Sequence, residues 1–578
     1  MFIFSLGKEI KLTDDSHEKE KISLGTAEVT LFFDKNKYSF DDQKEKTLLQ
    51  EKLIGQNAQD LNFFFTILFD KKKSQISVSC GTSFFKPVYY IENADAFFCS
   101  SHISLFQAIG LSLEENTDVL PEYFLYRCVS PPNTLFESVK LLNFGEALIV
   151  NMNHGKYSVE IQQSLNTSIS KDKDESEHID SILRALKDYL KLFENNKNKI
   201  ATLCSGGMDS LLLAKLVQKT LGSNKTYSTD YPVDFGGGMR ERKYALFAAQ
   251  ELKTDHTFYE FGIHEYFHGL IDSISAAEMP VHHLQSVCMY NLFKKGILPE
   301  QRILLSGLGG DDIFGARNHE TVFRIGQYYP YYCFLPFKAF FKKLSYSLFK
   351  KCHRGYNLVR YFKHCEVSYA DEESFLWSIS AYGKIDWIKK VFRVSKKEIF
   401  KSRMNLLSLF PTTDMLTAIT YYYLFTSLVM TLSIWHRLAE NCNITLCSPL
   451  NNLRIIESSL KIPWKSKLQT QKYIIRTMCE NVGVSPALLN REKSSFGFDV
   501  RKWGGQSGFL MELISAFTVK EKKDQFKIDL FDTKGMEDAM TLWSLLNYYI
   551  WYRIFILRQP IEELHLLMKE CLKDWSSV

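Results

Sequence analysis

The chain lacks several features that would point to particular classes of protein. Its 12 cysteines include no C-x-x-C pair and no dense cluster, so reduced thiols in a cytoplasm are expected rather than a disulfide framework. A signal peptide is not expected either, because Met1–Leu6 is too short an apolar run before Lys8 and Glu9. The net charge of +5 is small for 578 residues, which argues against nucleic acid as the main partner.

The composition that is present is that of a globular protein. With 45% hydrophobic and 24% charged residues, the chain can bury sizeable cores, and its length suggests two or three domains. Residues 1–165 alternate strand-like runs with polar turns, which predicts a sheet-rich α+β domain; the expected strands are Ala27–Phe33, Phe63–Phe69, Gln75–Ser79, Lys86–Ile91 and Ala96–Ser100. A polar run from Ser164 to His178 predicts a linker, so residues 166–195 are assigned to a linker and a leading helix.

The stretch Ala201–Ser210 combines an apolar run, a Ser-Gly-Gly turn and the start of an apolar segment with helical period. This pattern predicts a buried strand, a tight turn and a helix N-terminus. Free backbone N–H groups and the helix dipole make such a turn a phosphate cradle, and its glycines let phosphate approach the backbone. Asp209 stands in the first turn, where it can stabilise the helix end or hold Mg²⁺.

A second stretch, Gln301–Gly315, repeats this order of apolar strand, glycine-rich turn and acid. Two such turns at the carboxyl ends of parallel strands would face one crevice, which is where open α/β sheets bind ligands. Asp209 and Asp311 would then offer two carboxylates to one metal–phosphate group.

These two stretches carry a family resemblance. Ser205–Ser210 resembles the pyrophosphatase loop of the asparagine synthetase superfamily, and Ser306–Gly315 resembles its second signature, Ser-Gly-x-Gly-x-Asp-Glu-x-Phe-Gly. The resemblance implies that residues 196–578 form a PP-loop ATP pyrophosphatase domain of the adenine nucleotide α-hydrolase type, with a parallel sheet and added helices. It also implies ATP and Mg²⁺ as cofactors.

The resemblance assigns roles residue by residue. Lys472 falls where the family has a lysine that stabilises charge at the reacting centre, and Glu278, His283 and His436 are the further catalytic candidates. Asp209 and Asp311 are the expected metal ligands. The implied ATP site comprises Cys204, Ser205, Gly206, Gly207, Asp209, Ser210, Thr229, Ser306, Gly307, Gly309 and Lys493.

The amino-terminal part resembles the glutaminase domain of the same superfamily, an Ntn-type β-sandwich, through Phe85–Tyr90, Ala96–Ser101 and Pro131–Val139. A working glutaminase of this type carries a cysteine directly after the initiator methionine, whereas this chain has Phe2. We therefore expect residues 1–165 to be a degenerate domain without amidohydrolase activity. The amine would come from another molecule or from the substrate itself.

Further departures from the family lie where an acid substrate would sit. They include His436 in place of an aspartate, Thr445 and Cys447 in place of Glu and Arg, and Leu308 at the variable position of the second loop. These changes disfavour asparagine synthesis. The expected reaction is adenylation of a carboxylate followed by amide formation, most like that of lasso-peptide macrocyclases. The expected partners are then a peptide or small-molecule carboxylate, together with a leader-binding protein and a leader peptidase.

Several alternatives remain open at this level. A β-lactam synthetase-like cyclase, an ammonia-dependent asparagine synthetase and an inactive scaffold are the other functions considered. His264–His268 matches H-E-x-x-H, the zinc protease motif, and Met415–Trp435 carries no charge and is long enough to cross a bilayer, although a buried helix is favoured. The basic, aromatic stretch within residues 317–410 predicts a helical insertion and a docking surface for an acidic or extended peptide.

Overall fold

The computed structural model describes the chain in separate ranges: residues 1–6, 17–24, 27–34, 38–42, 46–51, 65–83, 85–93, 96–153, 156–166, 174–231, 239–315, 319–320, 323, 381–408, 414–490, 509–519, 522, 525–526 and 536–573. Two of the expectations fall outside them. These are Lys493 and most of the basic insertion, of which α13 (Ile385–Phe392) and α14 (Lys396–Ser408) are described.

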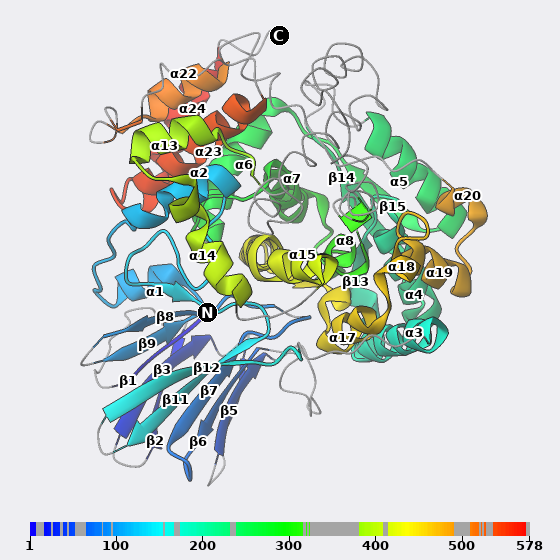
Figure 1. The fold of residues 1–578 in the computed structure, drawn as a ribbon, viewed down its shortest axis with the longest axis horizontal. Coiled ribbons are helices and arrows are strands. Elements are labelled where there is room, and N and C mark those ends of the chain that lie inside the picture. Colours follow the sequence, from blue (N-terminus) through cyan, green and yellow to red (C-terminus); the bar gives the residue numbers. More distant parts are fainter. Residues whose placement is uncertain are drawn as a thin grey trace, which may run out of the picture.

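Two antiparallel sheets of six strands each form the lower part of the molecule (Figure 1). The first sheet has the order β10 (Lys140–Leu141), β8 (Tyr89–Glu92), β9 (Phe97–Ser100), β1 (Phe2–Leu6), β3 (Ala27–Asp34) and β2 (His17–Leu24). The second has the order β12 (Lys156–Gln163), β11 (Glu146–Asn153), β7 (Gln75–Ser79), β6 (Thr66–Asp70), β5 (Lys46–Glu51) and β4 (Tyr38–Asp42). The sheet-rich domain predicted for residues 1–165 is thus present as a two-sheet sandwich.

Aromatic side chains from the two sheets meet in the sandwich core. The Phe2 ring stacks on the Phe65 ring with centroids 4.8 Å apart, and the Phe4 and Phe69 centroids are 6.1 Å apart. Phe2 has 0% of its surface exposed, and its backbone pairs with β3 and β9. Position 2 is therefore an apolar core position of β1, without a side-chain nucleophile.

The second half of the molecule contains a five-stranded parallel sheet, as the sequence predicts. Its order is β15 (Asp255–Tyr259), β14 (Lys225–Thr229), β13 (Ile200–Leu203), β16 (Ile303–Leu305) and β17 (Thr445–Cys447). The strand order reverses between β13 and β16, since β14 and β15 extend to one side and β16 and β17 to the other. Such a reversal leaves a crevice at the carboxyl ends of the strands.

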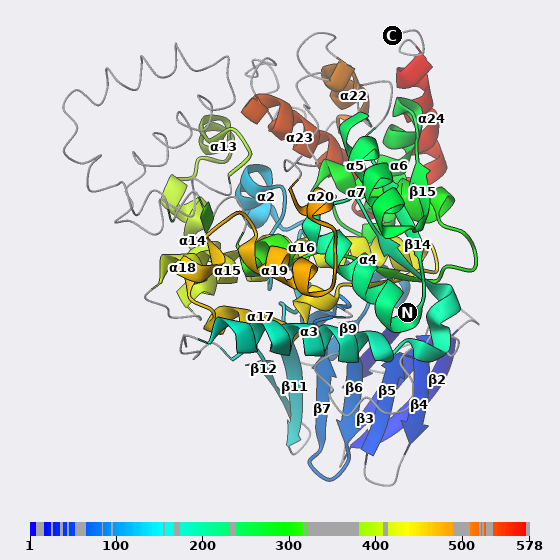
Figure 2. The same cartoon turned by 90° about the vertical axis from the view of Figure 1, so that its right-hand side faces the viewer.

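Helices cover both this sheet and the edge of the sandwich. α4 (Met208–Leu221) packs on β13, and α5 (Met239–Leu252) packs on β14 and β15. α3 (Glu175–Lys191) and α17 (Leu453–Lys461) lie side by side above the sandwich strands (Figure 2). Further helices of this half include α6 (Ile263–Ala277), α7 (Leu284–Asn291), α8 (Gly310–Phe314), α18 (Trp464–Lys467), α19 (Tyr473–Asn481) and α20 (Pro486–Leu489).

The uncharged stretch forms α15 (Met415–Tyr423), a π-helical turn (Leu424–Leu428) and α16 (Val429–Asn441). Within the described ranges, this is the one helical stretch long and apolar enough to cross a membrane, and 89% of its most apolar window is buried inside the protein. That burial supports the interpretation of a core helix.

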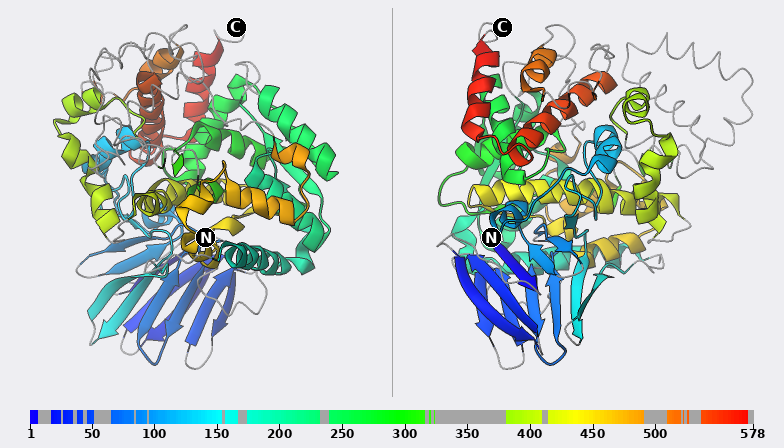
Figure 3. Two further views of the ribbon diagram at one scale, coloured as in Figure 1. Left: turned by 45° about the vertical axis from the view of Figure 1, so that its right-hand side comes forward. Right: turned by 90° about the vertical axis from the view of Figure 1, so that its left-hand side faces the viewer.

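A helix of the amino-terminal part packs against helices of the carboxyl-terminal part. α2 (Leu120–Tyr126), from the amino-terminal part, contacts α23 (Met536–Phe555), and the Tyr123 hydroxyl donates a hydrogen bond of 2.8 Å to the Ser544 carbonyl oxygen. α22 (Phe509–Phe517) and α24 (Ile561–Leu572) complete this helical cluster, which Figure 3 shows on the side of the molecule away from the sandwich. The domain boundary near residue 165 stays a prediction, because α2 is embedded in helices of the other half.

A buried ion pair ties α2 to α14. The Arg403 guanidinium donates to Glu122 over 2.9 Å and to the Tyr422 hydroxyl over 2.6 Å, and its centre lies 3.6 Å from the centroid of the Tyr126 ring. Arg403 is 1% exposed and Glu122 is 4% exposed. Each charge therefore depends on the other for its compensation.

Replacing Arg403 with methionine (R403M) should lower the midpoint of thermal unfolding by several degrees. The change leaves Glu122 buried without its cation, and breaking such a pair typically costs about 3–5 kcal/mol. Circular dichroism against temperature measures the shift. The matched control is K191M, which removes a pair whose side chains are 64% and 71% exposed and should leave the midpoint unchanged. Equal midpoints for R403M and wild type would contradict this role of the pair.

Candidate functional site

A cavity of about 340 Å³ opens at the carboxyl ends of β13, β14 and β16, at the reversal of strand order. Both predicted loops contribute to its wall, so the two motifs meet in space as the sequence predicts. The lining residues are Leu203, Cys204, Ser205, Gly207, Asp209, Ser210, Tyr227, Ser228, Thr229, Gln285, Met289, Leu292, Ser306, Gly307, Leu308, Gly309, Asp311, Asp312 and Trp435.

The first loop joins β13 to α4. Gly207 is the N-cap of α4, and no side chain caps this helix. The Ser205 hydroxyl accepts a hydrogen bond of 3.4 Å from the Gly207 N–H, while the Ser210 hydroxyl donates one of 2.8 Å to the Gly207 carbonyl oxygen. The positive end of α4 therefore faces the cavity without a competing side-chain acceptor, as a phosphate site requires.

The second loop depends on two glycines. Gly309 has a φ of +89°, and a Cβ atom at this position would overlap the side-chain oxygen of Asn451. Asn451 in turn donates a hydrogen bond of 3.3 Å to the Leu308 carbonyl oxygen. A Cβ atom at Gly310 would collide with the Asp209 carboxylate, so glycine there lets the two loops approach each other.

Lys472 joins the two loops. Its ammonium pairs with the Asp209 carboxylate and, over 2.6 Å, with Asp311. Burial opposes the charge on Lys472, but Asp209 and Asp311 outweigh it, so the pKa of the ammonium is raised above its usual value. Lys472 is the N-cap of α19 and adopts a left-handed conformation with a φ of +53°, which is uncommon for lysine and typical of functional sites.

The carboxylates of Asp209 and Asp311 fit a phosphate-bound magnesium ion. The Oδ1 atom of Asp209 is buried and accepts no hydrogen bond, so one oxygen beside the phosphate loop is available for a cation. Over the described ranges, no group of three or more His, Cys, Asp or Glu side chains forms a metal site. Two carboxylates with phosphate oxygens and water are the ligands Mg²⁺ commonly takes beside nucleotides.

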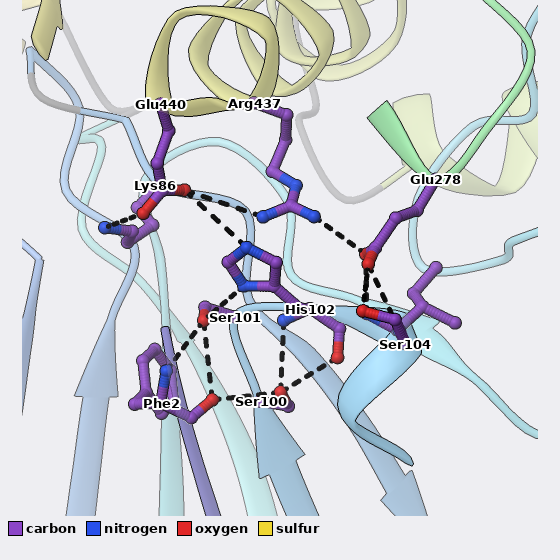
Figure 4. A network of polar contacts seen from close by, with 10 residues as sticks. Phe2, Lys86, Ser100, Ser101, His102, Ser104, Glu278, Arg437 and Glu440 are labelled. Carbon is purple, nitrogen blue, oxygen red and sulfur yellow. Dashed lines mark hydrogen bonds and ion pairs between the residues drawn. The ribbon is translucent and has the colours of Figure 1, made fainter. Parts of the chain in front are cut away.

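Glu278 lies away from this cavity. Its carboxylate accepts hydrogen bonds from the backbone N–H groups of Ile103, over 2.7 Å, and Ser104, over 3.2 Å, which begin α1 (Ile103–Ala108). It also pairs with Arg437 over 3.0 Å. Figure 4 shows this carboxylate between the sandwich and α16. Glu278 therefore binds the first turn of a helix of the amino-terminal half and does not line the cavity, so a catalytic role for it stays a prediction.

The two histidine candidates occupy different positions. His283 is the N-cap of α7 and its Nδ1 atom lies 3.2 Å from a guanidinium nitrogen of Arg127; burial and then Arg127 lower its pKa to about 3. His436 is a buried residue of α16. Neither lines the cavity, although each is close in sequence to a residue that does, Gln285 and Trp435 respectively.

The other predicted nucleotide residues divide into two groups. Cys204, Ser205, Gly207, Ser210, Ser306, Gly307 and Thr229 line the cavity, and the Thr229 hydroxyl donates a hydrogen bond of 2.8 Å to the Tyr259 carbonyl oxygen. Gly206, with a φ of +75°, shapes the turn without lining the cavity.

Some lining residues were missed by sequence reasoning. Asp312 directly follows Asp311, a predicted metal ligand, so the second motif already indicated this part of the site. Gln285, Met289 and Leu292 come from α7 and the π-helical turn after it, and Trp435 comes from α16, where its Nε1–H donates a hydrogen bond of 3.1 Å to the Ser286 hydroxyl. No local pattern marks these four residues, because only packing brings the helices to the sheet.

The H-E-x-x-H segment lies on α6. Its glutamate pairs with Lys295 over 2.9 Å and accepts a hydrogen bond from the Tyr259 hydroxyl. His268 lies 2.9 Å from His565, which lies 2.8 Å from Asp272. These side chains bind one another in an arrangement that differs from the zinc protease pattern.

Comparisons with known proteins find matches to both halves of the chain. The asparagine synthase family model matches residues 183–553, and the glutamine amidotransferase domain model matches residues 48–160. The chain is 22% identical over 534 residues to asparagine synthetase 1, glutamine-hydrolyzing, of Bacillus subtilis, covering 88% of this chain and 80% of that protein. It is 24% identical over 255 residues, 43% of its length, to a protein of Methanocaldococcus jannaschii provisionally named glutamine-hydrolyzing asparagine synthetase 2. The chain spans about half the length of that archaeal relative, with 48% covered.

Replacing Gly309 with alanine (G309A) should weaken ATP binding at least about tenfold, equivalent to 1.4 kcal/mol. The added methyl group strains a backbone at φ +89° and displaces Asn451 from the loop. Calorimetric titration with a non-hydrolysable ATP analogue measures the change.

The matched control is G110A. Gly110 has a similar φ of +86°, but a Cβ atom there would meet nothing within 4 Å. This variant carries the backbone strain without the collision, so its affinity for the analogue should equal that of wild type. Unchanged binding by G309A would show that the Asn451 contact does not shape the site.

Proposed function

Because the chain belongs to the asparagine synthase family, we propose that it is an ATP-dependent carbon–nitrogen ligase that forms AMP. A substrate carboxylate attacks the α-phosphorus of ATP and releases pyrophosphate. An amine then attacks the acyl-adenylate carbonyl, and AMP leaves as the amide forms. The observation that carries this proposal is the junction of Lys472, Asp209 and Asp311 at the mouth of two glycine-rich loops.

Each part of the site has a separate task in this reaction. The uncapped N-terminus of α4 binds the phosphate chain, and the raised pKa of Lys472 keeps its ammonium charged where pyrophosphate leaves. Asp209 and Asp311 would hold Mg²⁺, which neutralises phosphate charge when bound. Met289, Leu292 and Trp435 also line the cavity, and their apolar side chains would help to exclude water.

The amine does not come from glutamine hydrolysis in this proposal. Phe2 supplies no nucleophile at the position where the family carries its catalytic cysteine. Burial, followed by the nearby Glu146, raises the pKa of the Cys80 thiol to about 12, so this thiol of the same domain stays protonated. An amine carried by the substrate itself is therefore favoured, because positioning within one molecule can remove roughly 7–11 kcal/mol of a barrier.

We further propose that the substrate is a peptide that closes to a macrolactam. The charged side chains that line the cavity are those of Asp209, Asp311 and Asp312, and no Arg, Lys or His of the described ranges is among the lining residues. The nearby Lys472 ammonium is already paired with Asp209 and Asp311. Leu308 stands at the variable position of the second loop. A small amino acid would need fixed charges for its ammonium and its second carboxylate, whereas a side chain within a peptide presents one carboxylate. A leader-binding protein and a leader peptidase would act alongside.

Nucleotide product analysis tests the ligase. Purified protein with ATP and Mg²⁺ should release AMP and pyrophosphate only when a precursor peptide from a neighbouring gene is present, and the peptide should lose one water. D209N and K472M should each reduce this rate about 10²–10³-fold, since each removes a charge that stabilises the departing phosphate. The control D188N changes an aspartate whose side chain is 71% exposed and should retain full activity.

The other outcomes identify the alternatives. Turnover with aspartate and ammonia would indicate asparagine synthesis, and turnover with a small β-amino acid would indicate a β-lactam synthetase-like cyclase. ADP in place of AMP would exclude adenylation. An unaltered cellular phenotype of D209N, with no turnover under any condition, would identify a scaffold.

A further inference from the structure

Three arginines are buried among the described residues, Arg127, Arg403 and Arg437. They differ in whether a carboxylate pairs with the guanidinium. Arg403 pairs with Glu122 over 2.9 Å, and Arg437 pairs with Glu278 over 3.0 Å and with Glu440 over 3.5 Å. Arg127 is 4% exposed, yet no described carboxylate pairs with it. A buried guanidinium stays protonated, and leaving such a charge without a counter-ion is costly.

The described groups that contact Arg127 are a histidine and a tyrosine, not carboxylates. One of its guanidinium nitrogens lies 3.2 Å from Nδ1 of His283, whose pKa burial and then Arg127 lower to about 3. The Tyr382 ring lies over the guanidinium, with its centroid 3.8 Å away. Burial also raises the pKa values of the nearby Cys128 and Tyr231, so neither supplies a negative charge. The Nε atom of Arg127 is buried without a hydrogen-bond partner.

The position of Arg127 connects it to the nucleotide crevice. Arg127 is the C-cap of α2 in the left-handed region, with a φ of +63°, and its side chain reaches the start of α7. His283 is the N-cap of α7 and makes no side-chain cap, so the positive end of this helix adjoins the guanidinium. Gln285, two residues further on, lines the cavity. Tyr382, whose ring lies over Arg127, is 38% exposed, and a ligand would have to displace this side chain to reach the guanidinium.

We propose that Arg127, with His283 and the N-terminus of α7, forms a subsite for a carboxylate carried by the acyl substrate. This inference rests on the proposed ligase function and adds a contribution from the amino-terminal half to substrate recognition. The carboxylate bound here belongs to another residue of the peptide, outside the cavity wall, and is distinct from the side-chain carboxylate that is adenylated beside Lys472. Its negative charge would compensate the guanidinium, as Glu122 compensates Arg403.

The variant R127M tests the subsite without any need for turnover. Removing an uncompensated buried charge should raise the unfolding midpoint of the ligand-free protein by about 2 °C or more, whereas R403M, the paired arginine, lowers it. Glutarate, a simple dicarboxylate, should raise the midpoint of wild type and have no effect on R127M. R127K keeps the charge and should keep part of the glutarate response. A non-hydrolysable ATP analogue with Mg²⁺ should stabilise wild type and R127M equally.

Each of three results would overturn the proposal. R127M could lower the midpoint of the ligand-free protein as R403M does, which would mean that the guanidinium is already compensated. Wild type could show no response to saturating glutarate. The ATP analogue could lose its effect on R127M, which would assign the guanidinium to a nucleotide phosphate.

Kinetics give a separate measurement once turnover is established. R127M should raise KM for the carboxylate substrate about 10- to 100-fold, the range for hydrogen bonds to charged groups, and leave KM for ATP unchanged. Because the thermal measurements require no turnover, a failure of the ligase assay and a failure of the subsite are distinguishable. An unchanged KM for the carboxylate would count against the subsite alone.

Discussion

The ammonium of Lys472 between Asp209 and Asp311 is the interaction on which the site depends. Two carboxylates that are both close enough to pair with one ammonium would repel each other without it, and the buried Lys472 cation compensates both. The close approach is possible because Gly310 has no side chain and because the strand order reverses between β13 and β16. The same junction sets the charge balance of the cavity: a cation and a helix N-terminus attract phosphate, and an unpartnered oxygen of Asp209 remains for a metal ion.

The amino-terminal sandwich supports this site indirectly, through buried ion pairs with α16. Lys86 pairs with Glu440 over 3.3 Å, and Glu440 and Glu278 bind Arg437 from two sides (Figure 4). Burial opposes the charge on Glu440, but Lys86, His102 and Arg437 outweigh it and hold its pKa well below the usual range. This buried network holds α16, the helix that carries Trp435 into the cavity wall. The amino-terminal sandwich thus helps to hold one wall of the candidate site in place.

Charge divides the molecule into regions with different tasks. Near the two loops, the Lys472 ammonium is paired with Asp209 and Asp311. This arrangement suits the binding of a metal ion and phosphate and the release of pyrophosphate. At the start of α7, no carboxylate of the described ranges pairs with the Arg127 guanidinium, which contacts a histidine and a tyrosine side chain. In the function proposed above, the first region takes the nucleotide and the second takes a carboxylate of the acyl substrate.

The sequence by itself determined the parallel sheet, the two loops and the residues on them, because each strand, turn and helix start is a local pattern of apolar period and glycine. It also determined that position 2 carries no nucleophile. Only the tertiary structure decided that Glu278 binds the start of α1, that Asn451 packs against Gly309, and that Arg127 is buried with no carboxylate of the described residues beside it. These facts depend on contacts between residues more than a hundred positions apart. Such contacts arise from the packing of whole helices and strands, and no local sequence pattern indicates them.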